Sequence, residues 1–191
     1  MSRSGQQMRS AFGPALLGQV GGLDPVERDA IRSRVADSTL EHYAGAMAIG
    51  WTSMALHMEL SDAIRDVVGP ERNVELWTEA MAHMTNRPLL SGFLRHVGGR
   101  FGVHPGSIYT QTARLWQHLC RGVGELEATI DARCATAELR GFPVEDHEFI
   151  CFVEGLDGCL RGIVRPLHVE PEVERLEVDL ERGRVKYEIS W

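Results

Sequence analysis

Residues 147–162 read HEFICFVEGLDGCLRG, a stretch in which apolar residues recur with the period of a helix. Three glycines lie inside it, although each glycine weakens a helix by about 1 kcal/mol relative to alanine. At roughly 100° per residue, the small residues gather on one narrow face between an apolar stripe and a charged stripe. This small-residue face consists of Cys151, Gly155, Gly158, Cys159 and Gly162.

A helix face with so few side chains is useful where another backbone or a flat molecule comes very close to it. The pattern therefore predicts close packing of a second helix, either within the chain or across a dimer. A second interpretation is that the face forms one wall of a pocket. Cys151 and Cys159 lie about 12 Å apart along the helix axis, which is too far for a disulfide or a shared metal ion.

Strands are predicted on both sides of this helix. Apolar and polar residues alternate over 126–130 and 135–139, and again over 185–191 after an apolar-rich segment at 173–180. Alternation with period two is typical of strands that bury one face. The order β-β-α-β-β predicts an α+β protein with a four-stranded antiparallel sheet and the helix packed on its apolar face.

The part of the chain before residue 124 is predicted to be helical. Asp24 and Pro25 have the pattern of a helix N-cap followed by proline at the first helical position, and Gly69-Pro70 has the pattern of a helix end. The helical segments are expected at 24–35, 39–49, 52–68, 73–83, 89–97 and 108–120. Because the start of the chain is polar and rich in small residues, residues 1–22 are predicted to be a flexible N-terminal segment, and residues 23–191 a single domain.

Composition argues against several classes of protein. The chain has 191 residues and a net charge of −7, which disfavours nucleic-acid binding. It has no signal peptide pattern and no apolar stretch of membrane length, so we expect a cytoplasmic protein without membrane insertion. The four cysteines lack the CxxC spacing of structural zinc sites, which favours free thiols and no metal.

No catalytic motif occurs in the sequence, and we therefore expect no enzymatic activity and no catalytic residues. The histidines are dispersed; among them are His83, His96, His104, His118 and His147. A cysteine–histidine pair brought together by the fold, for instance at Cys120 or Cys151, stays open as an alternative.

Several segments together resemble a known family. RLWQHLCRGVGELEATI (114–130), AELRGFP (137–143), GLDGCLRG (155–162) and YEISW (187–191) follow one another as in an uncharacterised family abundant in myxobacteria. GWTSMALHMELSDAIRDVVG (50–69) extends the similarity over most of residues 50–191. That family is distantly similar to 4-vinyl-reductase-type ligand-binding domains, haem–nitric-oxide sensors and subunits of vesicle-tethering complexes. The resemblance implies an α+β fold that is often dimeric.

Two departures from these relatives concern metal and haem. The 4-vinyl-reductase-type domains usually carry cysteines in the last hairpin, whereas residues 173–191 contain none. Haem sensors carry a Tyr-x-Ser-x-Arg motif, and no such motif follows Tyr43, Tyr109 or Tyr187. Both departures disfavour a metal or haem centre, and the sequence indicates no particular cofactor.

These observations favour a non-enzymatic sensor or interaction domain, homodimeric, with a small hydrophobic molecule bound between the sheet and the helices. Two alternatives stay open: a dimeric adaptor with a solid core and no ligand, and a haem- or metal-based sensor that uses a histidine of the helical part. The residues expected to line the cavity are Trp116, Phe149, Cys151, Phe152, Gly155 and Cys159.

Overall fold

The computed structural model describes residues 5–87, 91–92, 104–143 and 146–191, and for residues 146–148 it describes the backbone alone. The helices are α1 (Phe12–Val20), α2 (Pro25–Arg32), α3 (Asp37–Gly45), α4 (Met54–Thr85), α6 (Pro105–Leu119), α7 (Asp146–Gly162) and the 3-10 helix η2 (Arg165–Leu167). The strands are β1 (Gln7–Arg9), β2 (Trp51–Ser53), β3 (Cys120–Arg121), β4 (Glu125–Asp131), β5 (Cys134–Arg140), β6 (Glu172–Asp179) and β7 (Arg184–Ser190). The predicted segment 89–97 lies almost wholly outside the described residues.

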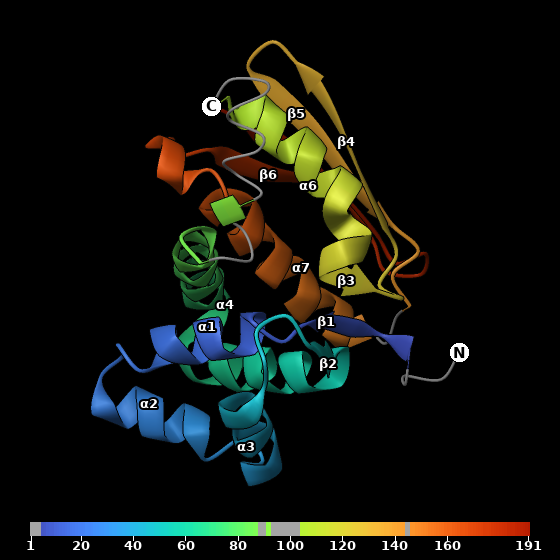
Figure 1. Ribbon diagram of the computed structural model, residues 1–191. Helices are drawn as coiled ribbons and strands as arrows, with labels where there is room; N and C mark the ends of the chain where they lie inside the picture. The colour runs from blue at the N-terminus through green and yellow to red at the C-terminus, as the bar shows by residue number, and fades with distance from the viewer. Residues whose placement is uncertain (1–4, 88–90, 93–103, 144–145) are drawn as a thin grey trace.

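The larger sheet has four antiparallel strands in the order β4-β5-β7-β6. Leu126 pairs with Leu139 and Ala128 with Ala137, so the alternation in the sequence places apolar side chains on one face. In Figure 1, α6 lies along the sheet, while α1, α2 and α3 lie at the opposite end of the molecule. The predicted α+β class and the four-stranded antiparallel sheet are confirmed. Packing of α6 on β4 and β5 was not predicted.

Residues 7–20 correct the prediction of a flexible segment over residues 1–22. Strand β1 is the central strand of a second, three-stranded sheet and pairs with β2 and β3. Helix α1 buries Phe12, Leu16 and Val20, which recur every four residues and so share one face. The polar composition of the first ten residues hid this order, because three-residue strands are too short to show an alternation.

Helix α4 contains a kink where the sequence predicts a helix end. Gly69 has φ +85°, in the region that favours glycine, and Pro70 opens the second half of the helix. The predicted segments 52–68 and 73–83 are therefore the two halves of one kinked helix. The predicted N-cap of α2 is confirmed, since the Asp24 carboxylate accepts hydrogen bonds from the backbone amides of Val26 and Glu27.

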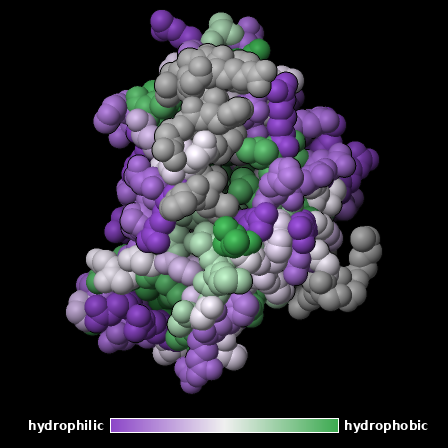
Figure 2. Space-filling view, viewed as in Figure 1, coloured by the Kyte–Doolittle hydropathy of each residue, from purple (hydrophilic) through white to green (hydrophobic). Residues whose placement is uncertain are grey.

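The visible surface is mostly hydrophilic, with smaller hydrophobic groups over its middle and lower parts (Figure 2). In the part of the chain that the structure describes, no helix combines the length and the apolar character needed to cross a membrane.

Candidate functional site

The small-residue face of α7 packs against α4. A Cβ atom on Gly158 would lie 2.5 Å from the Trp77 Cβ and 2.6 Å from the Val74 carbonyl oxygen. A Cβ atom on Gly162 would collide in the same way with the Thr78 carbonyl oxygen. The two backbones therefore lie nearly in contact, and the predicted close helix packing is confirmed within the chain.

An apolar cavity of about 40 Å³ lies beside this contact. Its wall combines α1, both halves of α4, α6, α7 and strands β1, β3 and β4. The aromatic part of the wall consists of Phe12, Trp77, Trp116 and Phe152. The sulfur-containing part consists of Met8, Met58, Met81, Cys120 and Cys159. Side chains from the N-terminal, middle and C-terminal parts of the chain thus meet at one site.

The N–H and O–H groups of the wall side chains donate hydrogen bonds to residues that do not line the cavity. The Thr112 hydroxyl donates to the Ile108 carbonyl at 2.8 Å, within its own helix. The indole N–H of Trp116 donates to the Gly124 carbonyl at 3.1 Å, and that of Trp77 donates to the Ser61 hydroxyl at 3.2 Å. A buried water usually needs two to four polar partners. The cavity therefore favours an apolar occupant over water.

Four of the six residues predicted to line a ligand cavity lie in the wall of this one, namely Trp116, Phe152, Gly155 and Cys159, and their binding of a ligand stays a prediction. The other two do not line this cavity. Phe149 packs on Phe142, with ring centroids 5.2 Å apart. Cys151 donates from its Sγ to Asp62 Oδ1 at 2.6 Å. Both residues lie on α7, but their side chains leave the helix in directions that do not reach the cavity.

The sequence prediction missed the whole part of the wall that lies before residue 112, and from that residue onward it missed Thr112, Leu119, Cys120, Leu126, Leu156, Leu160 and Ile163. Trp77 and Met81 are four residues apart on α4, which is a signal that they share a helix face. Met8 and Phe12 gave no comparable signal, because they reach the site only through the pairing of β1 with β2 and β3.

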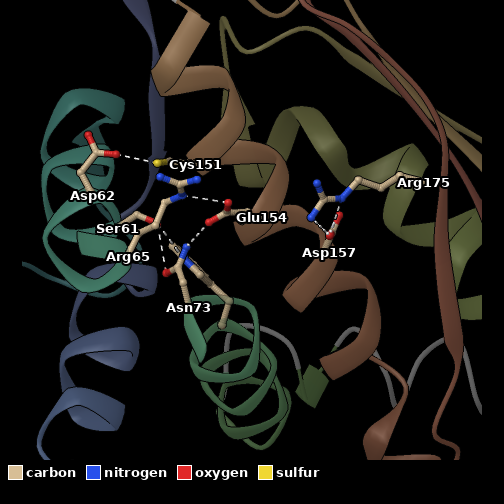
Figure 3. A network of polar contacts seen from close by, with 9 residues as sticks. Ser61, Asp62, Arg65, Asn73, Cys151, Glu154, Asp157 and Arg175 are labelled. Carbon is tan, nitrogen blue, oxygen red and sulfur yellow. Dashed lines mark hydrogen bonds and ion pairs between the residues drawn. The ribbon is translucent and has the colours of Figure 1, made fainter. Parts of the chain in front are cut away.

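A buried polar network joins α7 to both halves of α4 (Figure 3). Glu154 is 3% exposed and accepts hydrogen bonds from Arg65 Nε and from Asn73 Nδ2, each at 2.9 Å. Arg65 precedes the kink at Gly69 and Asn73 follows it, so one carboxylate holds both halves of α4. Ser61 continues the network, since it donates to Asn73 Oδ1 and accepts from the Trp77 indole. The network therefore ends at the cavity wall.

A second buried carboxylate on α7 contacts the sheet. Asp157, which is 3% exposed, pairs with Arg175 of β6 at 2.6 Å (Figure 3). Burial raises the pKa of Asp157 even though Arg175 acts in the opposite direction. Burial also raises the pKa of the Cys159 thiol to about 12, so this thiol is neutral near pH 7.

The described residues do not assemble a metal or catalytic group of the usual kinds. No cluster of three or more His, Cys, Asp or Glu side chains occurs among them. Within the described ranges, the Cys151 and Cys134 thiols donate to the Asp62 carboxylate and to the Asp131 carbonyl, not to a histidine. The cysteine–histidine pair left open by the sequence is thus not formed within the described part of the chain.

Among the histidines whose side chains the structure describes, His57 is fully buried, and it lies outside the cavity wall. Its Nδ1 is 3.1 Å from the Tyr43 hydroxyl. Burial lowers the pKa of His57 from 6.5 to about 3, with a smaller contribution from His42. Between these two values the unfolded chain binds a proton that the folded chain does not.

We therefore expect His57 to make stability fall as pH falls below 6.5. The contribution of neutral His57 to the free energy of unfolding is fully present above that pH. Below it, this contribution decreases by about 1.4 kcal/mol per pH unit, a total loss of about 2 kcal/mol at pH 5. Urea unfolding at a series of pH values would show a shallower acid slope in His57→Leu than in the wild type. His118→Gln, at an exposed position, serves as the control and should keep the wild-type slope. Parallel slopes for His57→Leu and the wild type would contradict the prediction.

No protein-family model and no curated protein matches this chain. Solved structures with the same fold include H-NOX domains. One comes from a study of haem redox potential and protein-induced porphyrin distortion; it is 13% identical, with TM-score 0.60 over 96% of this chain and 100% of its own. Another is the unliganded Fe(II) form of an H-NOX mutant from K. algicida, 10% identical, with TM-score 0.59 over 96% of both chains.

A third is an oxygen-binding H-NOX domain related to soluble guanylate cyclases, in its oxygen complex. It is 13% identical, with TM-score 0.50 over 96% of this chain and 94% of its own. At these identities the comparisons show a shared fold. The broader part of the resemblance, to haem–nitric-oxide sensors, thus holds at the level of the fold, and membership of the myxobacterial family stays a prediction.

Proposed function

We propose that this chain is a non-enzymatic sensor domain that binds a small apolar molecule in the cavity between α4, α6 and α7. The observation that carries the proposal is a buried cavity in which the N–H and O–H groups of the wall side chains are already hydrogen-bonded. The H-NOX fold supports it, because the similar structures include a domain in complex with oxygen.

The cavity volume limits the size of the molecule. An apolar cavity of about 150 Å³ binds benzene or xenon. The cavity in this chain measures about 40 Å³ and therefore suits a molecule no larger than a single xenon atom, a diatomic gas or a very short hydrocarbon. Xenon is a suitable probe because it is an apolar and chemically inert atom.

We expect xenon under pressure to bind the wild type and to bind Thr112→Leu much more weakly, because leucine adds volume inside the wall. The measurement is the concentration-dependent chemical shift of ¹²⁹Xe. Thr110→Leu is the matched control: its hydroxyl also donates to the carbonyl four residues earlier, but it does not line the cavity. Equal xenon binding by both variants, or none by the wild type, would contradict the proposed site.

Haem is the second candidate, because the similar structures include haem proteins. The described residues do not fit a haem in this cavity. Among the described residues, no histidine and no basic side chain belongs to the wall, so this part of the chain supplies neither an axial imidazole nor a partner for the propionates there. The volume of about 40 Å³ is also far below that of a porphyrin. Absorption spectra of the purified chain, before and after addition of haem, test this candidate; a stable Soret band with a histidine-ligated spectrum would favour it over the neutral molecule.

An adaptor role is the third candidate, and exposed apolar side chains favour it. Met47 and Ile49, in the connection between α3 and β2, are 74% and 67% exposed. Isolated hydrophobic side chains of this size are common on surfaces, so they support a partner surface only weakly. Sedimentation equilibrium tests the homodimer expected from the sequence, because a monomer at micromolar concentration would contradict it. Native mass spectrometry would show whether a small molecule co-purifies with the chain.

A further inference from the structure

The chemistry of the cavity wall is unusual in its sulfur content. Five sulfur-containing side chains line one cavity of about 40 Å³. They come from four elements that are distant in the chain: β1 carries Met8, α4 carries Met58 and Met81, β3 carries Cys120, and α7 carries Cys159. The wall residues that the structure describes include no carboxylate and no imidazole.

Among the described wall side chains, these sulfur atoms are the electron-pair donors that no hydrogen bond occupies. The Thr112 hydroxyl and both indole N–H groups are engaged in other hydrogen bonds. Thioether and thiolate ligands select soft metal ions, copper(I) above all, whereas magnesium, calcium and manganese prefer oxygen. A cavity of this composition therefore discriminates strongly against the common hard cations.

Charge balance also favours a monovalent ion. An apolar interior penalises net charge severely. One thiolate neutralises one copper(I) ion, and thioethers complete the coordination without adding charge. A divalent ion would need both thiols to ionise. Cys159 is partly exposed, so its side of the wall offers the ion a path from solvent.

We propose that this cavity binds one copper(I) ion, with a thiolate from Cys159 or Cys120 and the thioethers of Met58 and Met81 as ligands. On binding, one S–H bond breaks and one S–Cu bond forms. The proton leaves to solvent, copper stays in the +1 state, and no electron is transferred. The proposal uses the same cavity as the proposed sensor function, but it does not require that the neutral molecule bind.

The test uses the full chain, kept reduced and free of oxygen, with copper(I) supplied in competition with the chelator bicinchoninate. Native mass spectrometry should show one copper per chain with the loss of one proton. X-ray absorption at the copper edge should show sulfur neighbours alone. Nitrogen neighbours would place the ion on histidines and overturn the proposal, as would the absence of a one-to-one complex.

Variants locate the ion. One of the two variants Cys159→Ala and Cys120→Ala, the one that removes the thiolate ligand, should weaken copper(I) binding by about tenfold or more, the lower end of what losing even an outer partner costs a metal site. The double variants Cys120→Ala/Cys159→Ala and Met58→Leu/Met81→Leu should each do the same. The leucine substitutions conserve volume, so the core should stay folded. Cys134→Ala and Met47→Leu, which do not line the cavity, should bind like the wild type. Unchanged affinity in all cavity variants would overturn the proposal.

Xenon binding on the same variants separates the two proposals. Met58→Leu/Met81→Leu should keep the apolar cavity and bind xenon while losing copper(I). If xenon binds but copper(I) does not, the copper site is wrong and the proposed function stands. If copper(I) binds with sulfur ligands and xenon does not bind, the neutral-molecule sensor is wrong and the copper site stands.

Discussion

Replacing Gly158 by alanine is expected to lower the free energy of unfolding by about 3 kcal/mol, the upper end of the cost of overpacking. The new Cβ would lie 2.6 Å from the Val74 carbonyl oxygen and 2.9 Å from the Thr78 amide nitrogen. Both are backbone atoms of α4, so no change of rotamer removes the clash. The better helix propensity of alanine returns only about 1 kcal/mol. Gly158→Leu should prevent α4 and α7 from packing at all.

Urea unfolding of a glycine-to-alanine series measures this effect. Gly18 lies in α1, and apart from its chain neighbours and its own helix backbone no heavy atom lies within 4 Å of its would-be Cβ, so Gly18→Ala should stabilise the chain by up to about 1 kcal/mol. A Cβ atom on Gly155 would lie 3.2 Å from the Trp77 ring, which is a side chain and can shift. The change in unfolding free energy for Gly155→Ala should therefore lie between those for Gly158→Ala and Gly18→Ala. If Gly158→Ala were as stable as Gly18→Ala, the backbone contact between α4 and α7 would not exist in solution.

The glycine face shows which features of the fold a sequence can reveal. Gly155, Gly158 and Gly162 share one face because helical geometry alone fixes their direction. The hairpin of β4 and β5 was predictable for the same reason, since alternation is a local property. The partner of the glycine face was not predictable, because the contact with Val74 and Thr78 joins segments about eighty residues apart.

The cavity was only partly predictable for a related reason. Residues after 112, such as Trp116 and Phe152, could be assigned from their place near the sheet. Met8 and Phe12 required knowledge that β1 enters the molecule between β2 and β3. The sequence also predicts the wrong exposure for two acidic residues of α7. Glu154 and Asp157 belong to its charged stripe, which would ordinarily face solvent, yet each is 3% exposed.

The burial of Glu154 leads to the second large expected effect. Glu154→Ala leaves the Asn73 amide, which is fully buried, without its acceptor, and leaves the Arg65 guanidinium without its partner. Removing one member of a buried pair costs about 3–5 kcal/mol. Because the Arg65 side chain is 37% exposed and can be hydrated, we expect a loss near the lower end, about 3 kcal/mol. Glu154→Gln should cost less, since its amide oxygen still accepts from Asn73.

The matched control is Glu75→Ala, also the removal of a carboxylate that pairs with an arginine. Glu75 and Arg72 are 60% and 52% exposed, so this pair should contribute less than about 1 kcal/mol. Urea unfolding of both alanine variants tests whether Glu154 holds the two halves of α4 together. Because the network continues through Ser61 to Trp77, Glu154→Ala should also alter xenon binding, whereas Glu75→Ala should not. Equal losses of stability in the two variants would mean that packing alone holds the two halves of α4 together at the Gly69 kink. The Glu154 carboxylate would then not connect these two halves.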